Sequence, residues 1–151
     1  MGRKQLSTLL LASGSHPRSL AESLEKAAGA DPETAPIIAL ARSVERSAKD
    51  EKLLGLLGQS RQDKVLVFAS FRRTLEHLQQ LLAEAGIGYV TFSGAESDRQ
   101  KDEAVEAFRQ SVPVMLCSES GGEGRNLQFA NTLVNYDLPW NPNRKEQRFG
   151  R

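Results

Sequence analysis

From residue 63 onward, short apolar runs alternate with longer segments in which apolar residues recur with the helical period. Runs of this length, rich in β-branched and aromatic residues, are typical of strands that are buried on both faces. The strands predicted in this way are KVLVFAS, IGYVTFSG, VPVMLCS and NTLVNYDL, and the helices between the first three are FRRTLEHLQQLLAEAG and ESDRQKDEAVEAFRQ. The order strand, helix, strand, helix, strand indicates right-handed βαβ units on a parallel sheet.

Each of these two helices has one apolar face, which we expect to cover the sheet. Gly86 follows the first helix and predicts its end, because glycine readily adopts the left-handed conformation of a helix terminus. The inward positions are expected to be Leu75, Leu78, Leu81, Leu82 and Ala85 in the first helix, and Ala104, Val105 and Phe108 in the second.

The chain before residue 63 contains no convincing strand and is predicted to be helical. HPRSLAESLEKAAG has the features of a helix with both ends marked. Ser15 or His16 can cap its first turn, Pro17 suits that turn, and Gly29 is a stop signal.

Two further helices are predicted before the first strand. DPETAPIIALARSVER has the helical period, and Pro36 limits where that helix can start. SAKDEKLLGLLGQ begins with a Ser-x-x-Asp pattern that resembles a cap, and its leucines 53, 54, 56 and 57 form an apolar face. We therefore divide the chain into an N-terminal helical segment, residues 1–62, and an α/β lobe, residues 63–151.

Composition and charge narrow the class of protein. The net charge of +1 gives no overall signal for nucleic acid or membranes, although the last twelve residues hold four basic residues and one acid. A lone cysteine excludes an internal disulfide framework and fits a reducing compartment. No apolar run approaches the roughly 18 residues of a membrane span, and the first residues lack the features of a signal peptide. We expect a cytoplasmic protein without a membrane partner.

Function in open parallel sheets collects at the carboxyl ends of the strands. Two of the four strand ends carry unusual residues. GGEG directly follows the third strand, and its glycines allow either a tight strand-to-helix turn or close approach of the backbone to a phosphate. A dinucleotide-binding fingerprint is excluded, because Leu127 occupies the position of the third glycine.

DLPWNP follows the fourth strand, where two prolines hold the chain extended around a tryptophan. That tryptophan is either a plug in the core or a wedge against a nucleic-acid groove. RKEQRFGR is basic, and it is either a solvated helix or one that points a pair of arginines at phosphate.

The remaining residues with reactive side chains give little functional signal. His16 and His77 are isolated in the sequence and lie outside these loops, so we expect surface or packing roles for them. Cys117 ends a buried strand without a neighbouring histidine, which indicates a structural role. No metal site is predicted.

Taken in order, these segments resemble the second RecA-like lobe of superfamily 2 helicases, and more narrowly that of SNF2-type DNA translocases of the bacterial RapA-like branch. DKVLVFASFRRTLEHL is similar to motif IV of that family, and FSGAESDRQKDEAVEAF to the segment after it. SESGGEGRNLQFANTLVNYDLPWNP resembles motif V with its extension, and EQRFGR the first part of motif VI. The resemblance is strong over residues 63–151, weaker over 41–62, and loose over 1–40. The tryptophan favours the SNF2 branch over the DEAD-box RNA helicases.

The resemblance implies roles for individual residues. Arg151 would be an arginine finger that stabilises charge on the transferring phosphoryl group, and Gln147 and Arg148 would hold motif VI against a facing lobe. The motif V turn at the cleft between lobes would comprise Gly121, Gly122, Glu123, Gly124 and Asn126. The DNA contacts would be Ser70, Phe71, Arg72, Ser93, Gly94, Ser118, Arg125, Trp140 and Asn141.

The sequence also lacks two features of a complete motor. It has no Gly-Lys dipeptide and so no Walker A loop, and its two Asp-Glu dipeptides lie in predicted helices rather than at a strand end. The resemblance therefore implies that the first lobe lies outside this chain and binds most of the ATP and Mg²⁺. We expect no cofactor on this chain alone and no ATP hydrolysis by it. Because motif VI is cut at Arg151, we interpret the end of the chain as a fragment boundary.

The function implied for the intact protein is ATP-driven translocation on double-stranded DNA. Its expected partners are DNA, the first lobe, and RNA polymerase or another DNA-bound complex. Two alternatives remain open: a stand-alone module that binds nucleic acid or protein, and a lobe that remodels RNA or RNA polymerase. The small net charge argues against strong DNA binding by the chain alone, because affinity scales with the phosphates neutralised.

Overall fold

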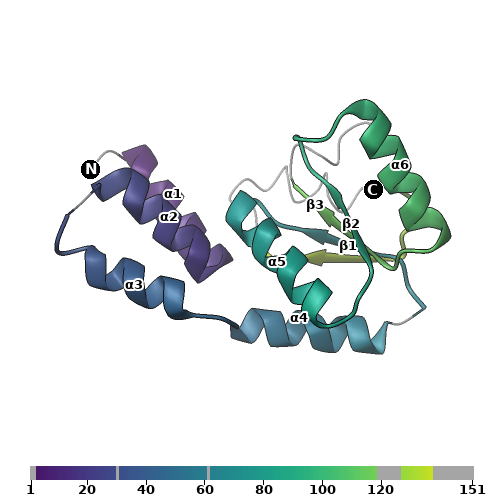
Figure 1. The fold of residues 1–151 in the computed structure, drawn as a ribbon, viewed down its shortest axis with the longest axis horizontal. Helices are drawn as coiled ribbons and strands as arrows, with labels where there is room; N and C mark the ends of the chain where they lie inside the picture. Colours follow the sequence, from purple (N-terminus) through teal and green to yellow (C-terminus); the bar gives the residue numbers. More distant parts are fainter. Residues whose placement is uncertain (1–2, 30, 61, 119–126, 138–151) are drawn as a thin grey trace.

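The computed structural model describes residues 3–29, 31–60, 62–118 and 127–137, which form a parallel sheet with helices on both faces and a helical segment beside it (Figure 1). The elements are α1 (Arg3–Ser15), α2 (Pro17–Ala28), α3 (Ala35–Ser43), α4 (Ala48–Gln59), β1 (Val65–Phe68), α5 (Arg72–Glu84), β2 (Tyr89–Phe92), α6 (Asp98–Gln110), β3 (Val114–Cys117) and β4 (Thr132–Asn135). This RecA-like α/β architecture confirms the predicted fold class, with all four predicted strands present.

The sheet has the order β2-β3-β1-β4, and each neighbouring pair is parallel. Phe68, the last residue of β1, lies opposite Cys117 of β3 and Asn135 of β4, and Cys117 lies opposite Phe92 of β2. The four strands therefore end level with one another. All the segments that follow the strands leave from one edge of the sheet.

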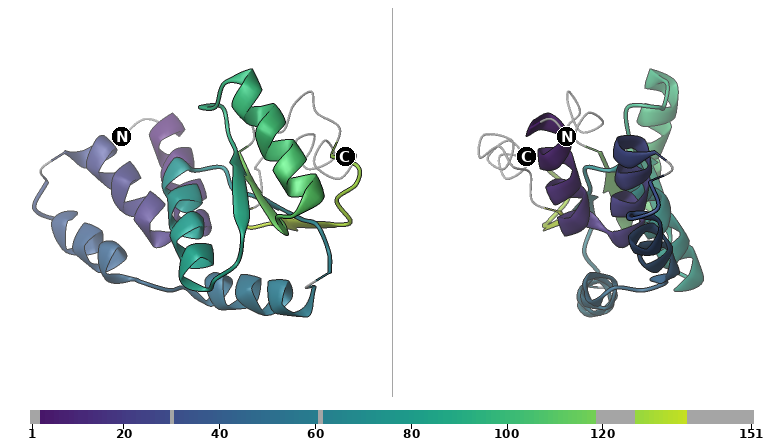
Figure 2. Two further views of the ribbon diagram at one scale, coloured as in Figure 1. Left: turned by 45° about the vertical axis from the view of Figure 1, so that its right-hand side comes forward. Right: turned by 90° about the vertical axis from the view of Figure 1, so that its left-hand side faces the viewer.

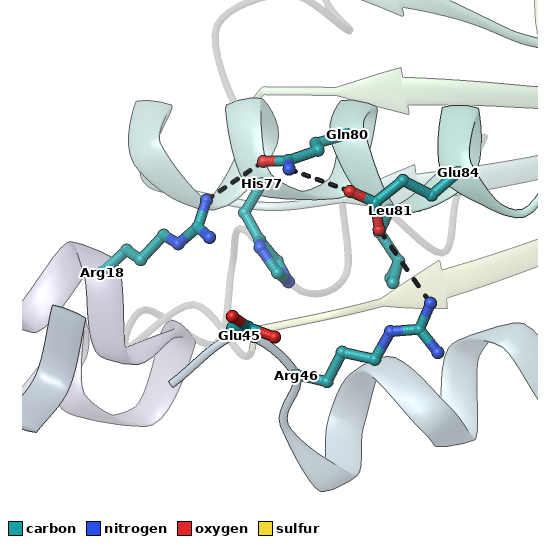
Figure 3. A pocket seen from close by; sticks show the side chains of 7 residues that line it. All are labelled: Arg18, Glu45, Arg46, His77, Gln80, Leu81 and Glu84. Carbon is teal, nitrogen blue, oxygen red and sulfur yellow. Dashed lines mark hydrogen bonds and ion pairs between the residues drawn. The ribbon is translucent and has the colours of Figure 1, made fainter. Parts of the chain in front are cut away.

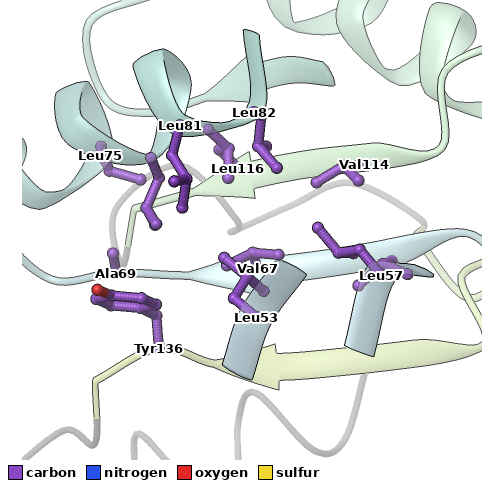
Figure 4. Close-up of a cluster of buried hydrophobic side chains, with 12 residues drawn as sticks. Leu53, Leu57, Val67, Ala69, Leu75, Leu81, Leu82, Val114, Leu116 and Tyr136 are labelled. Carbon is purple, nitrogen blue, oxygen red and sulfur yellow. The ribbon is translucent and has the colours of Figure 1, made fainter. Parts of the chain in front are cut away.

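The apolar residues of β1 alternate between the two faces of the sheet, so that each face has its own core. One core lies between the sheet and helices α4 and α5 (Figure 4). The other lies under α6 and the segment that begins at Leu127. The buried residues of the first core are Leu53, Leu57, Val65, Val67, Ala69, Leu75, Leu78, Leu81, Leu82, Val114, Leu116 and Tyr136. Those of the second are Leu66, Phe68, Phe92, Phe108, Met115, Cys117 and Leu127.

The N-terminal helices lie at one end of the molecule, beside α5 (Figure 2). Helix α2 packs against α1, α3 and α5, so it connects the helical segment to the lobe. Residues 3–29 and 31–60 contain no strand, as predicted.

The predicted signals at the ends of α2 are confirmed. The backbone of His16 is extended and its Nδ1 accepts a hydrogen bond from the backbone N–H of Arg18 at 3.2 Å. Pro17 occupies the first position of the helix, and Gly29 ends it with a φ of 62°, a conformation that favours glycine. Of the two capping residues considered, His16 is the one that caps this helix.

The capping pattern before α4 is also confirmed. Ser47 Oγ accepts from the backbone N–H of Asp50, and the Asp50 carboxylate accepts from the backbone N–H of Ser47 at 2.7 Å. Helix α5 is followed by Gly86 with a φ of 67°, as its sequence predicted.

Three features differ from the prediction. Helix α1 lies within the predicted helical segment but was not identified as a separate element, because its leucines form a run without a clear helical period or cap, yet it buries Leu9 and Ala12. Ala85 is exposed, because it follows the last residue of α5 and no longer lies on the inward face. Leu56 is 39% exposed, since only Leu53 and Leu57 of the predicted α4 face are buried against the lobe.

Substitution of Leu78 tests the core between α5 and the sheet. Leu78 is fully buried, so Leu78→Ala should lower the free energy of unfolding by about 3 kcal/mol through lost burial and a residual cavity. Leu56→Ala is the matched control, because that side chain is exposed, and it should change the value by no more than about 0.5 kcal/mol. Urea denaturation measures both, and equal effects would contradict this assignment of the core.

Candidate functional site

The carboxyl edge of the sheet gathers the described members of the predicted DNA-contact set. Ser70 follows β1, Ser93 and Gly94 follow β2, and Ser118 follows β3. Because β1 lies between β3 and β4, Ser70 is next to the ends of both, whereas the end of β2 lies beyond β3. The fold thus brings these predicted residues to one edge of the sheet, with the end of β1 between the ends of β3 and β4.

A buried carboxylate accepts hydrogen bonds that hold the middle of this edge together. Asp137, just after β4, is 7% exposed and accepts hydrogen bonds from the backbone N–H of Ser70 at 2.8 Å and from its Oγ at 2.9 Å. It also accepts from Ser15 Oγ, at the end of α1, at 2.8 Å. One side chain therefore connects the ends of β1 and β4 with the N-terminal helices. Sequence reasoning placed Asp137 at a strand end but gave it no role.

The hydroxyl groups behind Asp137 continue this connection into α5. Ser15 Oγ and Ser19 Oγ each lie 2.7 Å from Thr74 Oγ1, and all three residues are fully buried. Lys49 Nζ donates to the backbone carbonyl of Ser15 at 2.7 Å. Burial lowers the pKa of Lys49, and the nearby charges of Asp137 and Asp50 oppose that shift. These hydrogen bonds join the N-terminal helices to α5 and to the ends of β1 and β4.

The ends of β2 and β3 are arranged differently. The backbone N–H of Ser93 donates to Glu96 at 2.7 Å, and Ser93 Oγ donates to the same carboxylate at 2.8 Å. The backbone N–H of Ser118 donates to the carbonyl of Phe92 at 3.1 Å. Gly94 is exposed beside them. The loop after β2 is therefore held by Glu96, a residue that the sequence analysis did not single out.

The turn after β1 presents two of the predicted contacts outward. Phe71 is half-buried at the start of α5, and the Arg72 side chain is largely exposed, with its Nε 2.8 Å from Glu76. A groove of about 490 Å³ runs from this turn between α1 and α2. It is lined by Lys4, Gln5, Thr8, Leu9, Glu22, Ser23, Lys26, Ala27, Ser70, Phe71 and Arg72.

The rest of the predicted site lies outside the described residues. This applies to the motif V turn, the tryptophan segment and motif VI. The residues concerned are Gly121, Gly122, Glu123, Gly124, Arg125, Asn126, Trp140, Asn141, Gln147, Arg148 and Arg151. Their roles stay predictions.

A second polar cluster lies deeper, and it corrects the expectation that the histidines are isolated. His16 and His77 are buried with their rings stacked, 3.8 Å between centroids and 24° between planes. Asp50, at 0% exposure, lies 3.0 Å from His77 Nε2 and 3.7 Å from His16 Nε2. The expected packing role holds, but the three residues come together only in the folded chain. His77 also lines a 250 Å³ pocket between α2, α5 and the residues before α4 (Figure 3).

Asp50 is held as a carboxylate by its donors. Tyr136 donates its hydroxyl to Asp50 Oδ1 at 2.7 Å, and Ser47 donates both its N–H and its Oγ to Oδ2. Burial opposes ionisation, but the nearby imidazoles of His16 and His77 and the hydrogen bonds from Ser47 and Tyr136 outweigh it and hold the pKa of Asp50 well below its usual range. Burial, with Asp50 and Asp137 nearby, raises the pKa of Tyr136, so this hydroxyl remains a donor.

The cluster offers one ligand atom from each of His16, Asp50 and His77, all within 4.8 Å of one another. A tetrahedral ion, however, needs nitrogen lone pairs that converge. In stacked rings the nitrogen lone pairs point in roughly parallel directions and do not converge on one ion. The Asp50 carboxylate, in addition, already accepts three hydrogen bonds. His16 also uses its Nδ1 as an acceptor, which places its proton on Nε2. The arrangement therefore suits a proton better than a metal ion.

The chain is similar to helicase proteins over most of its length. The family model described as helicase conserved C-terminal domain matches residues 48–151. The chain is 48% identical over 89 residues to the uncharacterized ATP-dependent helicase YqhH of Bacillus subtilis, covering 59% of this chain. It is 46% identical over 105 residues to the RNA polymerase-associated protein RapA of Proteus mirabilis, covering 67% of this chain. The chain spans only 16% and 11% of the length of these two relatives.

Solved structures show the same fold. The C-terminal part of the Fun30 ATPase domain is 27% identical with a TM-score of 0.64, over 68% of this chain and 35% of that one. The Hef helicase domain of Pyrococcus furiosus has a TM-score of 0.67 over 97% of this chain and 36% of that one. Its identity is 21%, so this likeness shows the fold alone. No described helix is long and apolar enough to cross a membrane.

Substitution of Asp137 tests the fastening of the strand ends. Asp137→Asn replaces an acceptor oxygen by an amide group facing donors, so the free energy of unfolding should fall by about 2–3 kcal/mol. Glu103→Gln is the control, because this exposed carboxylate pairs with Arg99 across one turn of α6 and should cost less than about 0.5 kcal/mol. Equal values in urea denaturation would show that Asp137 does not fasten this edge.

The depressed pKa of Asp50 predicts acid sensitivity. Because the folded value lies below the unfolded one, ionised Asp50 stabilises the fold above about pH 4. That contribution is lost as the pH falls further. Asp50→Asn should cost about 3 kcal/mol at pH 7, because it leaves buried donors unmatched. It should also flatten the decline in melting temperature between about pH 5 and pH 3. An unchanged pH profile in the variant would refute this role.

Proposed function

The chain belongs to the helicase conserved C-terminal domain family, and on that premise we propose that it is the second RecA-like lobe of an SNF2-type, ATP-dependent translocase on double-stranded DNA. It is a RapA-like helicase C-terminal lobe, as the comparisons show. The observation that carries the finer proposal is the level carboxyl edge of the parallel sheet, where the segments resembling motifs IV and V leave from adjacent strands. We further propose the division into residues 1–62 and 63–151.

The proposed nucleic-acid contacts begin at the β1 turn. Arg72 presents a largely exposed guanidinium, and Gly94 lets a backbone approach the β2 end closely. Ser70 is held in place by Asp137 behind it. Groups of this kind bind the sugar-phosphate backbone and fix its register without reading sequence, which is what a translocase requires. Trp140 and Asn141 are proposed to add contacts from the segment after β4.

ATP and Mg²⁺ are proposed to be held mainly by the first lobe of the whole protein. Within the described edge, the hydroxyls of Ser70 and Ser93 are hydrogen-bonded to Asp137 and Glu96. This chain would complete the cleft with Arg148 and Arg151, whose guanidinium groups would stabilise charge on the phosphate. ATP supplies the phosphoryl transfer that drives movement.

A second candidate is a stand-alone module that binds nucleic acid or protein. The groove between α1, α2 and the β1 turn favours it, because its described lining holds three basic residues, Lys4, Lys26 and Arg72, and one acid, Glu22. RNA polymerase is a proposed partner of the whole protein, since relatives are named as RNA polymerase-associated.

DNA-stimulated ATP hydrolysis tests the main proposal. This chain alone should be inactive, and activity should appear when it is mixed with the separately expressed first lobe of the same protein. Arg151→Ala should reduce that activity by about 10³-fold or more, because the finger acts on the transition state. Arg99→Ala, an exposed arginine paired with Glu103 on α6, is the control and should leave the activity unchanged.

Two results would contradict the proposal. Activity of the chain alone would show that it binds and hydrolyses ATP without a first lobe. Activity of the mixture that survives Arg151→Ala would remove Arg151 from the cleft. If the mixture were silent while the chain alone bound duplex DNA, the binding module would be favoured instead.

A further inference from the structure

The buried cluster of His16, Asp50 and His77 joins the helical segment to the lobe. His16 lies between α1 and α2, Asp50 in the first turn of α4, and His77 in the middle of α5. The side chains of His16 and Asp50 are fully buried, and that of His77 is 4% exposed. The proposed DNA contacts do not use this cluster.

Asp50 is a buried carboxylate, and the nearest basic side chain among the described residues is that of His77. A buried carboxylate is stable only when a charge or several donors compensate for its lost hydration. Among the described residues, no lysine or arginine lies within 4 Å of Asp50, and the nitrogens that do belong to His16 and His77. Lys49 is directed elsewhere, because its Nζ donates to the carbonyls of Gly14 and Ser15. Ser47 and Tyr136 supply only neutral donors, so a positive charge within 4 Å of Asp50 would have to be that of an imidazole.

The two rings are not equivalent. His16 Nδ1 accepts from the backbone N–H of Arg18, so it carries no proton and His16 is neutral. Neither nitrogen of His77 has a hydrogen bond of good geometry to a described residue, but its Nε2 is 3.0 Å from Asp50 Oδ2. Two charged rings 3.8 Å apart would repel each other, so a single proton fits the stack.

We propose that His77 is an imidazolium ion in the folded chain, and that its ion pair with Asp50, covered by the neutral ring of His16, clasps the N-terminal helices onto the lobe. The clasp lies next to Asp137, which connects the same helices to the strand ends through Ser15. Whether His77 is charged therefore affects how the N-terminal helices are positioned against the lobe, behind the candidate DNA-binding edge.

The charged surroundings are compatible with a cation at His77. The pocket that it lines has both acidic and basic residues around it, and Arg46 pairs with Glu84 at 4.0 Å (Figure 3). Arg46 also lies 3.4 Å from Glu51. Arg18 donates to Gln80 at 3.3 Å rather than approaching the ring. The titratable or charged groups around the cluster are Arg18 of α2, Glu45 and Arg46 before α4, Lys49 and Asp50 of α4, Glu84 of α5, and Tyr136 and Asp137 after β4.

Nitrogen NMR of the imidazole rings tests the charge directly. The chain has only two histidines, so His16→Gln assigns the spectrum completely. At pH 7 both nitrogens of His77 should carry protons, while His16 should show a proton on Nε2 alone. In Asp50→Asn, His77 should become neutral. A neutral His77 in the unaltered chain, or one that stays charged in Asp50→Asn, would overturn the proposal.

Hydrogen exchange tests the clasp. His77→Gln should increase amide exchange in α2 and α4 by about tenfold or more, because the cluster joins these two helices to α5. Exchange in α6, which contributes no residue to the cluster, should be unchanged. Gln80→Ala, on the same helix and pocket, is the matched control and should have little effect. Equal effects of the two variants would refute the clasp. Saturable Zn²⁺ binding lost in His77→Gln would replace the ion pair by a metal site, and overturn it equally.

Discussion

The structure depends on one constraint, which is that a carboxylate taken out of water must be supplied with donors. Asp50 and Asp137 are both buried where α1, α4, α5 and the end of β4 meet. Their donors come from residues far apart in the chain, including Ser15, Ser70 and Tyr136. Satisfying these two charges fixes the position of the N-terminal helices relative to the sheet.

This constraint links the scaffold to the candidate site. The apolar cores on the two faces hold the strands level, and that brings the strand ends to one edge. Asp137 then fixes the turn at Ser70, so the exposed Arg72 projects from a rigid base. A lobe that moves along nucleic acid needs its contacts fixed to a rigid body, because loose contacts would not transmit a step.

The sequence predicted those parts whose signals are local. Continuous apolar runs predicted strands such as β1. The cap at His16 and the stop signal at Gly29 predicted α2. Helix α1 was not identified as a separate element because its leucines lack a clear helical period. The cluster of His16, Asp50 and His77 was also missed, since only tertiary packing brings these distant residues together. The roles assigned to motifs V and VI rest on the family resemblance.

Displacement of a third strand from a DNA triplex is the most direct test of the central claim, that this lobe belongs to a motor on duplex DNA. The measurement uses the whole protein that contains the lobe, with ATP and a blunt duplex bearing the triplex. Translocation predicts ATP-dependent release of the third strand without separation of the duplex strands. Duplex unwinding, or release without ATP, would contradict the claim.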